Sequence, residues 1–111
     1  MSDLAKKKCA PCEEKTGKLS SEQAQTFVEE LDTWKIIDEK FIEKTIQFKD
    51  FASALAFLNR VGEIAEQENH HPDMAIFSWN KLKFTLSTHS IGGLSENDFI
   101  LAAKIDELVR R

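Results

Sequence analysis

The chain has 111 residues, which is enough for one hydrophobic core and too few for two domains. Its hydrophobic fraction of 41% and its charged fraction of 31% are typical of a globular protein. The formal net charge of -4 argues against a nucleic-acid-binding protein, because contact with the phosphate backbone requires a basic surface.

Residues 1–18 form a polar stretch without a hydrophobic segment, and we expect them to be a flexible N-terminal arm. The arm is too polar for a signal peptide and no apolar run is long enough to span a membrane, so we expect a cytoplasmic protein. The arm contains one motif, the C-x-x-C of Cys9 and Cys12. Two thiolates cannot complete a zinc site and no strand precedes them, so we interpret them as reduced thiols, with metal sharing between chains as the alternative.

The hydrophobic pattern predicts three amphipathic helices. Ser20 and Gln23 form a capping box before the first helix, Asp50 can cap the second, and Ser95 and Asp98 form another capping box before the third. Apolar residues recur at helical spacing after each cap. The apolar stripe is widest in the second helix, which we expect to be the most buried.

Two pairs of β-prone segments lie between these helices, at residues 34–37 and 41–48 and at residues 74–79 and 81–88. The element order is therefore α-ββ-α-ββ-α. Because hairpins give antiparallel pairs and every helix is amphipathic, we predict an α+β fold in which helices cover a four-stranded antiparallel sheet. A single domain would span residues 19–111.

The chain has only three histidines, and two of them, His70 and His71, are adjacent. His70 follows Glu66 by four residues, so in a continuing helix the carboxylate would bond to the imidazole and fix its tautomer. Pro72 restricts His71 to an extended backbone, and we expect the helix to end there. The two imidazoles would then point in different directions and could serve as an acid and a base near neutral pH.

The residues themselves leave two other interpretations open. His70 and His71 could be exposed residues at a helix C-terminus, where they favour the helix dipole. With His89 and Asp98 they could form a metal site, although adjacent histidines rarely converge on one ion. His89 alone could be a hydrogen-bonded residue at a strand end, and a capping role fully explains Asp98.

The spacing of seven residues resembles that of the pterin-4a-carbinolamine dehydratase family. The seven are Glu66, His70, His71, Pro72, Trp79, His89 and Asp98. The likeness also covers the element order from about residue 20 to residue 111, and no motif residue departs from the pattern. Membership implies a hydro-lyase that converts 4a-hydroxytetrahydropterin to quinonoid dihydropterin, and so recycles the pterin cofactor of aromatic amino acid hydroxylases.

The same resemblance implies that His70, His71 and His89 surround the pterin and act without a metal or a cofactor. We assign proton transfer to His71 and His89. His70, oriented by Glu66, would bind the substrate and assist with the other stereoisomer.

Three further residues would support this site by the same resemblance. Trp79 would pack beside the pocket, Asp98 would anchor its wall, and Pro72 belongs to the histidine motif. The family also forms dimers or tetramers, and an exposed edge strand makes self-association physically reasonable.

Two other functions are compatible with the resemblance. Some members of the family serve as dimerisation cofactors of a transcription factor, and a bacterial-type variant could act in another pterin pathway such as molybdopterin metabolism. A protein that serves only in interactions would tolerate the loss of His71 and His89, whereas an enzyme would not.

Overall fold

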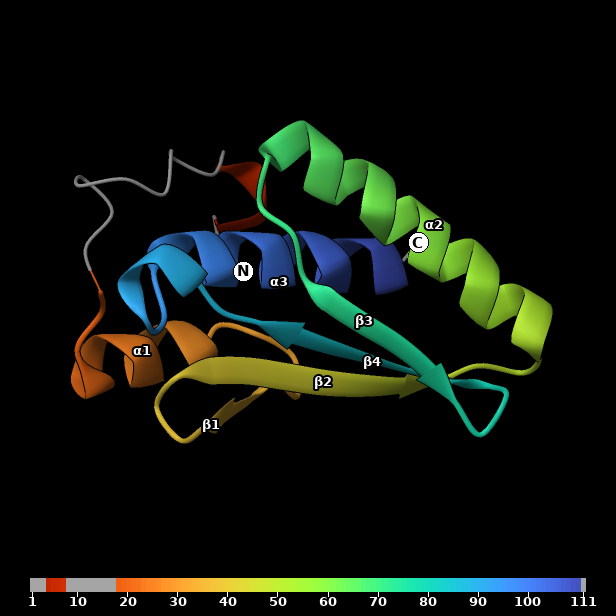
Figure 1. The fold of residues 1–111 in the computed structure, drawn as a ribbon, viewed down its shortest axis with the longest axis horizontal. Helices are drawn as coiled ribbons and strands as arrows, with labels where there is room; N and C mark the ends of the chain where they lie inside the picture. Colours follow the sequence, from red (N-terminus) through yellow and green to blue (C-terminus); the bar gives the residue numbers. More distant parts are fainter. Residues whose placement is uncertain (1–3, 8–17, 111) are drawn as a thin grey trace.

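The computed structural model describes residues 4–7 and 18–110 of the chain (Figure 1). Its elements follow the predicted order, with two additional short 3-10 helices, and the predicted α+β fold is confirmed. The elements are η1 (Leu4–Lys6), α1 (Ser21–Val28), β1 (Lys35–Ile37), β2 (Phe41–Gln47), α2 (Phe51–Glu68), β3 (Asp73–Phe77), β4 (Lys81–Leu86), η2 (His89–Ile91) and α3 (Glu96–Val109).

The four strands form one antiparallel sheet in the order β1-β2-β4-β3. Each hairpin supplies one central strand and one edge strand. The two hairpins join through β2 and β4, where Ile42 lies opposite Leu86 and Gln47 lies opposite Lys81. Strand β3, which follows the histidine pair in the sequence, is therefore an edge of the sheet.

One face of the sheet carries the core. Leu82, Phe84 and Leu86 on β4 are fully buried, whereas Lys83 between them is exposed. This period of two is the pattern of a strand with one covered face. The helices lie on the apolar side, and Figure 1 shows α3 crossing behind the strands, so the molecule has two layers.

The third helix, not the second, is the most buried. Nine of the 14 residues of α3 are buried, against four of the 18 residues of α2. The spacing of apolar residues identified the apolar face of each helix, but it could not show that α3 has neighbours on its other sides. One such neighbour is α1, whose Phe27 stacks on Phe99 with ring centroids 5.4 Å apart. No helix in the described part of the chain is long and apolar enough to cross a bilayer.

A buried polar network ties α3 to the sheet. The Nζ of Lys44 on β2 lies 2.8 Å from Oδ1 of Asp106 and also donates to the backbone oxygen of Asp32 at 2.7 Å. The indole nitrogen of Trp34 donates to the same Oδ1 at 2.9 Å. Only 7% of the Lys44 side chain and 3% of the Asp106 side chain are exposed, so this is a buried and fully partnered charge pair.

The N-terminal turn η1 packs against α3. Leu4 is 3% exposed and joins the core, Lys104 donates to the backbone oxygen of Ala5 at 2.7 Å, and Lys7 lies 2.6 Å from Glu96. The expected flexible arm over residues 1–18 therefore does not hold for residues 4–7, because Leu4 anchors them. The C-x-x-C at residues 9–12 lies outside the described residues.

Candidate active site

The end of α2 determines where the two adjacent histidines point. The helix ends at Glu68, and Asn69 adopts the left-handed conformation with φ 52° and ψ 39°. His70 therefore lies beyond the end of α2 and does not continue the exposed face of that helix. The expectation that Glu66 bonds to His70 one helical turn later is wrong, because Asn69 ends the helix before Pro72 could do so.

His70 turns inward and pairs with Asp98 on α3. Its side chain is 5% exposed, and its Nε2 lies 2.7 Å from Oδ1 of the fully buried Asp98 carboxylate. Because an ionised carboxylate only accepts hydrogen bonds, Nε2 carries the proton and donates it. In the neutral imidazole this leaves Nδ1 as the acceptor nitrogen. The group that orients His70 is therefore Asp98.

Asp98 both caps the start of α3 and accepts a hydrogen bond from His70. Its Oδ1 accepts from His70, while Oδ2 accepts from the backbone N–H of Ser95 at 3.0 Å, as the capping-box spacing predicted. The Oδ2 atom also accepts from the hydroxyl of Thr88 at 2.9 Å. The first turn of a helix favours a negative charge, so the position on α3 suits the carboxylate. Both oxygens of the Asp98 carboxylate are therefore hydrogen-bonded.

His71 pairs with Glu66 on the surface. Its Nε2 lies 2.6 Å from Oε2 of Glu66, and the two side chains are 54% and 78% exposed. The reversal at Asn69 brings His71 over the last turn of α2, where a continuing helix would have placed His70. The site thus contains one buried and one accessible imidazole, and each is bonded to a carboxylate.

The remaining motif residues near this pair are His89 and Pro72. His89 begins η2 directly after Thr88, whose hydroxyl contacts Asp98, so the backbone at His89 lies beside the buried pair. The side chain of His89 lies outside what the structure describes. Pro72 is half-buried and links His71 to the start of β3.

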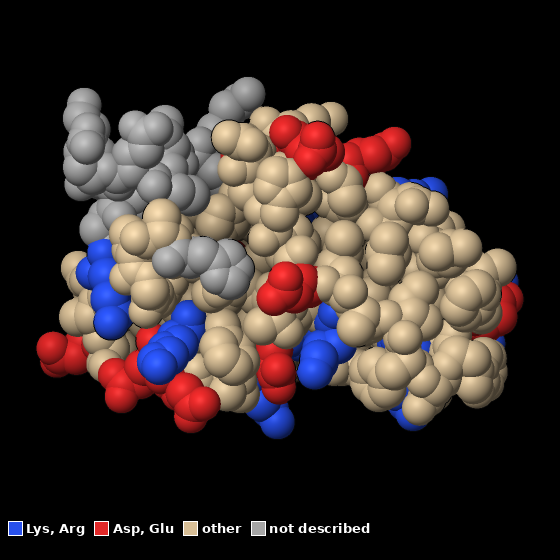
Figure 2. All heavy atoms as spheres, in the orientation of Figure 1, with Lys and Arg blue, Asp and Glu red and all other residues tan. Residues whose placement is uncertain are grey.

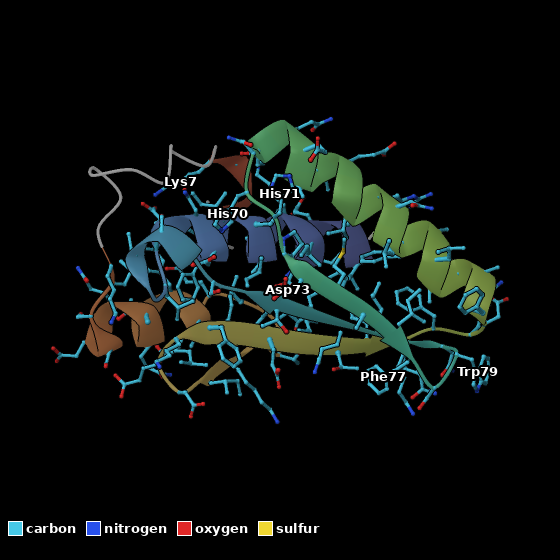
Figure 3. All side chains as sticks on the ribbon, viewed as in Figure 1. Lys7, His70, His71, Asp73, Phe77 and Trp79 are labelled. Atoms are coloured by element: carbon cyan, nitrogen blue, oxygen red, sulfur yellow. The ribbon has the colours of Figure 1, made fainter. Side chains whose placement is uncertain are left out.

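Trp79 does not reach this site within one chain. It lies at the tip of the β3–β4 hairpin and is 62% exposed, whereas His70 and His71 precede the opposite end of β3 (Figure 3). The five residues of β3 separate the two groups by roughly 16 Å of extended chain. The expectation that Trp79 packs beside the pocket is therefore not met by the residues of a single chain.

The adjacent imidazoles can donate and accept protons, and their carboxylate partners fix their orientation. Among the side chains that the structure describes, which do not include that of His89, no three of His, Cys, Asp or Glu form a group that could hold a metal ion. The sequence did not predict that Thr88 is a hydrogen-bond partner of Asp98. The only feature of the sequence that points to Thr88 is its position next to His89.

Comparison with known proteins identifies the family of the chain. A family model described as pterin 4 alpha carbinolamine dehydratase matches residues 17–108. A protein of Alkaliphilus metalliredigens that carries the same family name is 47% identical over 108 residues, which are 96% of each chain. The Arabidopsis thaliana protein named pterin-4-alpha-carbinolamine dehydratase 2, mitochondrial, is 43% identical and covers 97% of this chain and 60% of its own.

Solved structures show the same fold. A transcriptional coactivator/pterin dehydratase from Brucella melitensis superposes with a TM-score of 0.78 at 30% identity, over 83% of this chain and 98% of its own. A pterin dehydratase-like protein identified as a RuBisCO assembly factor shares the fold with a TM-score of 0.58 at 24% identity, over 69% of this chain. With the family match covering residues 17–108, the chain belongs to the pterin-4a-carbinolamine dehydratase family.

Proposed function

We propose that the chain is a hydro-lyase that dehydrates 4a-hydroxytetrahydropterin to quinonoid dihydropterin. The observation that supports this function most directly is the pair of adjacent histidines in a chain of this family. The imidazole of His70 is hydrogen-bonded to Asp98, and that of His71 is hydrogen-bonded to Glu66. A dehydration needs a proton donor and a proton acceptor. Imidazoles supply both near neutral pH.

The reaction breaks the C4a–O bond and the N5–H bond of the substrate. An imidazolium protonates the hydroxyl group, which leaves as water, and the lone pair of N5 forms the C4a=N5 double bond. A second imidazole then takes the N5 proton, whose bonding electrons become the new lone pair of N5. No electrons are gained or lost overall, so the step needs no redox cofactor, and the proposed mechanism assigns both proton transfers to imidazoles.

The burial of the histidines supports different roles for them. His71 is more than half exposed and can reach a substrate that arrives from solvent, so we assign it one of the two proton transfers. His89 performs the other, since its backbone lies next to Thr88 and the His70–Asp98 pair. His70 is buried and held by Asp98, which suits a group that positions the pterin and assists with the other stereoisomer.

In this role the protein would recycle the pterin cofactor of aromatic amino acid hydroxylases in the cytoplasm. It would act as a homodimer or homotetramer, since the sheet ends in the edge strand β3. A role in protein interaction is the second candidate, because the similar Brucella melitensis protein is named both a transcriptional coactivator and a pterin dehydratase.

The test is a stopped-flow assay of the variants His71→Ala and His89→Ala. The substrate is generated by an aromatic amino acid hydroxylase, and the loss of its absorbance is followed with and without a chelator. Each variant should slow the reaction by about 10²-fold or more, because one acid-base group contributes about 10² to 10⁴-fold. The matched control is Gln47→Ala, an exposed residue of β2 that makes no contribution to the site.

The outcomes separate the two functions. Activity that is lost in both histidine variants, retained in the Gln47 variant and unchanged by chelator supports the dehydratase. Full activity in both histidine variants would contradict the proposed mechanism. A folded protein that does not accelerate the reaction at all would favour the interaction role.

A further inference from the structure

His89 lies on a short loop whose two ends are joined by backbone hydrogen bonds. Thr88 and Gly93 face each other as an isolated antiparallel bridge, in which the N–H of Thr88 donates to the oxygen of Gly93 at 2.8 Å. The N–H of Ile91 donates to the oxygen of Thr88 at 3.2 Å, and Gly92 reverses the chain with a φ of 65°. The backbone of His89 therefore follows directly from the base of the loop, and its position depends on that of Thr88.

The side chain of Thr88 joins this loop to the start of α3. Its hydroxyl oxygen lies 2.9 Å from Oδ2 of Asp98 and 2.7 Å from the hydroxyl oxygen of Ser95. Because an ionised carboxylate only accepts hydrogen bonds, the single hydroxyl proton of Thr88 is donated to Asp98. Ser95 must then donate its own proton to Thr88, so the three side chains form a hydrogen-bonded chain with one direction.

All three of these side chains are buried. Thr88 is 2% exposed, and Ser95 and Asp98 are 0% exposed. Burying a hydroxyl group costs free energy, which a valine of the same shape would avoid in its own side chain. Packing therefore does not explain why this position carries a hydroxyl, whereas the contact with Asp98 does.

A threonine transmits the position of its hydroxyl to its own backbone. The branched β-carbon restricts rotation about χ1, so a hydroxyl held at Asp98 also fixes the backbone of Thr88. Asp98 is itself fixed, because its Oδ2 accepts from the backbone N–H of Ser95 at 3.0 Å and its Oδ1 accepts from His70 at 2.7 Å. One carboxylate oxygen is thus bonded to His70, and the other is bonded to the residue that precedes His89.

We propose that Thr88 is a positioning residue that holds the backbone of His89 at a fixed place relative to the His70–Asp98 pair. The inference rests on the proposed function, which assigns one of the two proton transfers to His89. Thr88 acts through the residue that follows it and does not touch the substrate. A misplacement of about 1 Å can slow an enzyme by about 10²-fold, so the loss of this one contact is measurable in the rate.

Two substitutions of Thr88 separate the effect of its hydroxyl from that of its shape. Thr88→Val keeps the shape and removes the hydroxyl, and it should lower kcat by about tenfold or more with a smaller change in KM. Thr88→Ser keeps the donor and should keep kcat within about threefold of the unmodified protein. A valine variant with unchanged kcat, or a serine variant as slow as the valine variant, would overturn the proposal.

The matched control is Thr45→Val, the same chemical change on β2. Thr45 is exposed, and Figure 2 shows charged side chains gathered over the β1–β2 hairpin, so this part of the molecule faces solvent. The control should leave kcat unchanged. If Thr88→Val does not fold, Thr88→Cys assayed under reducing conditions replaces it, because a thiol is a weak donor. Thr88→Cys should then be slower than Thr88→Ser, and equal rates would overturn the proposal.

A double-mutant cycle tests whether Thr88 acts through His89. In the His89→Ala background, Thr88→Val should lower the remaining rate by less than about twofold, because the group that Thr88 positions is already absent. A purely structural role of Thr88 would lower the rate by the same factor in both backgrounds. That result would overturn the proposal.

Amide hydrogen exchange tests the Thr88–Asp98 contact without reference to activity. The N–H groups of Ile91 and Gly93 both donate to the backbone oxygen of Thr88, at 3.2 and 3.5 Å. Thr88→Val should speed their exchange by about tenfold or more relative to Thr88→Ser, whereas the N–H of the fully buried Phe84 in β4 should stay protected.

The failure of this proposal and that of the proposed function are distinguishable. Unchanged exchange of the two loop amides in Thr88→Val would show that Thr88 does not hold the loop and would overturn the proposal. If the unmodified protein does not accelerate the dehydration, the proposed function fails, and the exchange experiment still decides whether Thr88 fixes the backbone of His89.

Discussion

The imidazole of His70 lies 2.7 Å from the carboxylate of Asp98, although the two residues are 28 positions apart in the sequence. This contact joins the C-terminal end of α2 to the first turn of α3. It also places a buried imidazole at a fixed orientation directly before the accessible His71. The proposed chemistry depends on this arrangement.

Replacing Asp98 with Asn should impair both stability and activity. An amide of the same size cannot accept from His70 on one side and from Ser95 and Thr88 on the other. We expect a loss of about 1–3 kcal/mol in the free energy of unfolding, because a buried donor loses its acceptor. Urea denaturation measures the stability, and stopped-flow should show a rate at least about tenfold lower.

The control for this variant is Glu96→Gln, two positions earlier in α3. Glu96 is half-buried, with 40% of its side chain exposed, and pairs with the surface residue Lys7, so its loss should change the stability by less than about 1 kcal/mol. If Asp98→Asn were as stable and as active as the control, the buried pair would have no role in the site.

Replacing Glu66 with Gln should lower activity without affecting stability. Glu66 and His71 are both largely exposed, so their bond contributes less than about 1 kcal/mol to folding. The carboxylate nevertheless orients the imidazole, and its loss should slow the dehydration by about tenfold or more. Glu63→Gln, an exposed change one turn earlier on α2, should leave the rate unchanged. Equal rates in the two variants would exclude an orienting role for Glu66.

The buried pair of Lys44 and Asp106 should determine stability and not catalysis. Lys44→Met leaves the Asp106 carboxylate buried without its cation, which typically costs about 3–5 kcal/mol. Trp34→Phe removes one hydrogen bond to Asp106, which costs about 1 kcal/mol, and also part of a buried ring that packs against Phe84. Urea denaturation measures both variants. A Lys44→Met protein as stable as the unmodified protein would show that the charge pair contributes little.

The N-cap of α2 should make stability depend on pH. The Ser53 hydrogen bonds to Asp50, from its side chain and from its backbone N–H at 2.7 Å, lower the pKa of the Asp50 carboxyl below its usual value. A lowered pKa in the folded state means that the stabilisation is present at neutral pH and is lost as the pH falls through the acidic range. Asp50→Asn, which keeps a capping side chain, should lose this part of the pH dependence while keeping most of its stability at pH 7.

Thermal denaturation of both proteins between pH 7 and pH 3 measures this effect. The Tm difference between the unmodified protein and Asp50→Asn should shrink or reverse as the pH falls. A constant difference over that range would show that the Asp50 charge does not contribute to the cap.

Local features of the sequence predicted the elements, because they depend on neighbours within a few positions. The caps at Ser20 and Asp50 and the Ser95–Asp98 backbone contact are all present. The end of α2 lies earlier than Pro72 predicts, because the helix is ended by Asn69, a residue type that commonly adopts the left-handed conformation after a helix.

Contacts between distant elements could not be predicted in the same way. Nothing near His70 indicates that Asp98 is its partner, because their contact requires α2 and α3 to be packed together first. Lys44 did carry a signal, since it lies on the apolar side of its strand between Ile42 and Ile46, where a charge requires a buried partner. The identity of that partner, Asp106, depended on the packing of α3.

The central claim is that this protein accelerates the dehydration of 4a-hydroxytetrahydropterin. The most direct measurement is the first-order rate constant for decay of the enzymatically generated compound, as a function of protein concentration, with the His71→Ala protein as the matched comparison. The account predicts a rate constant that rises in proportion to the unmodified protein and stays close to the buffer value with His71→Ala. A rate constant that is independent of the unmodified protein, at concentrations where that protein is folded, would contradict the account.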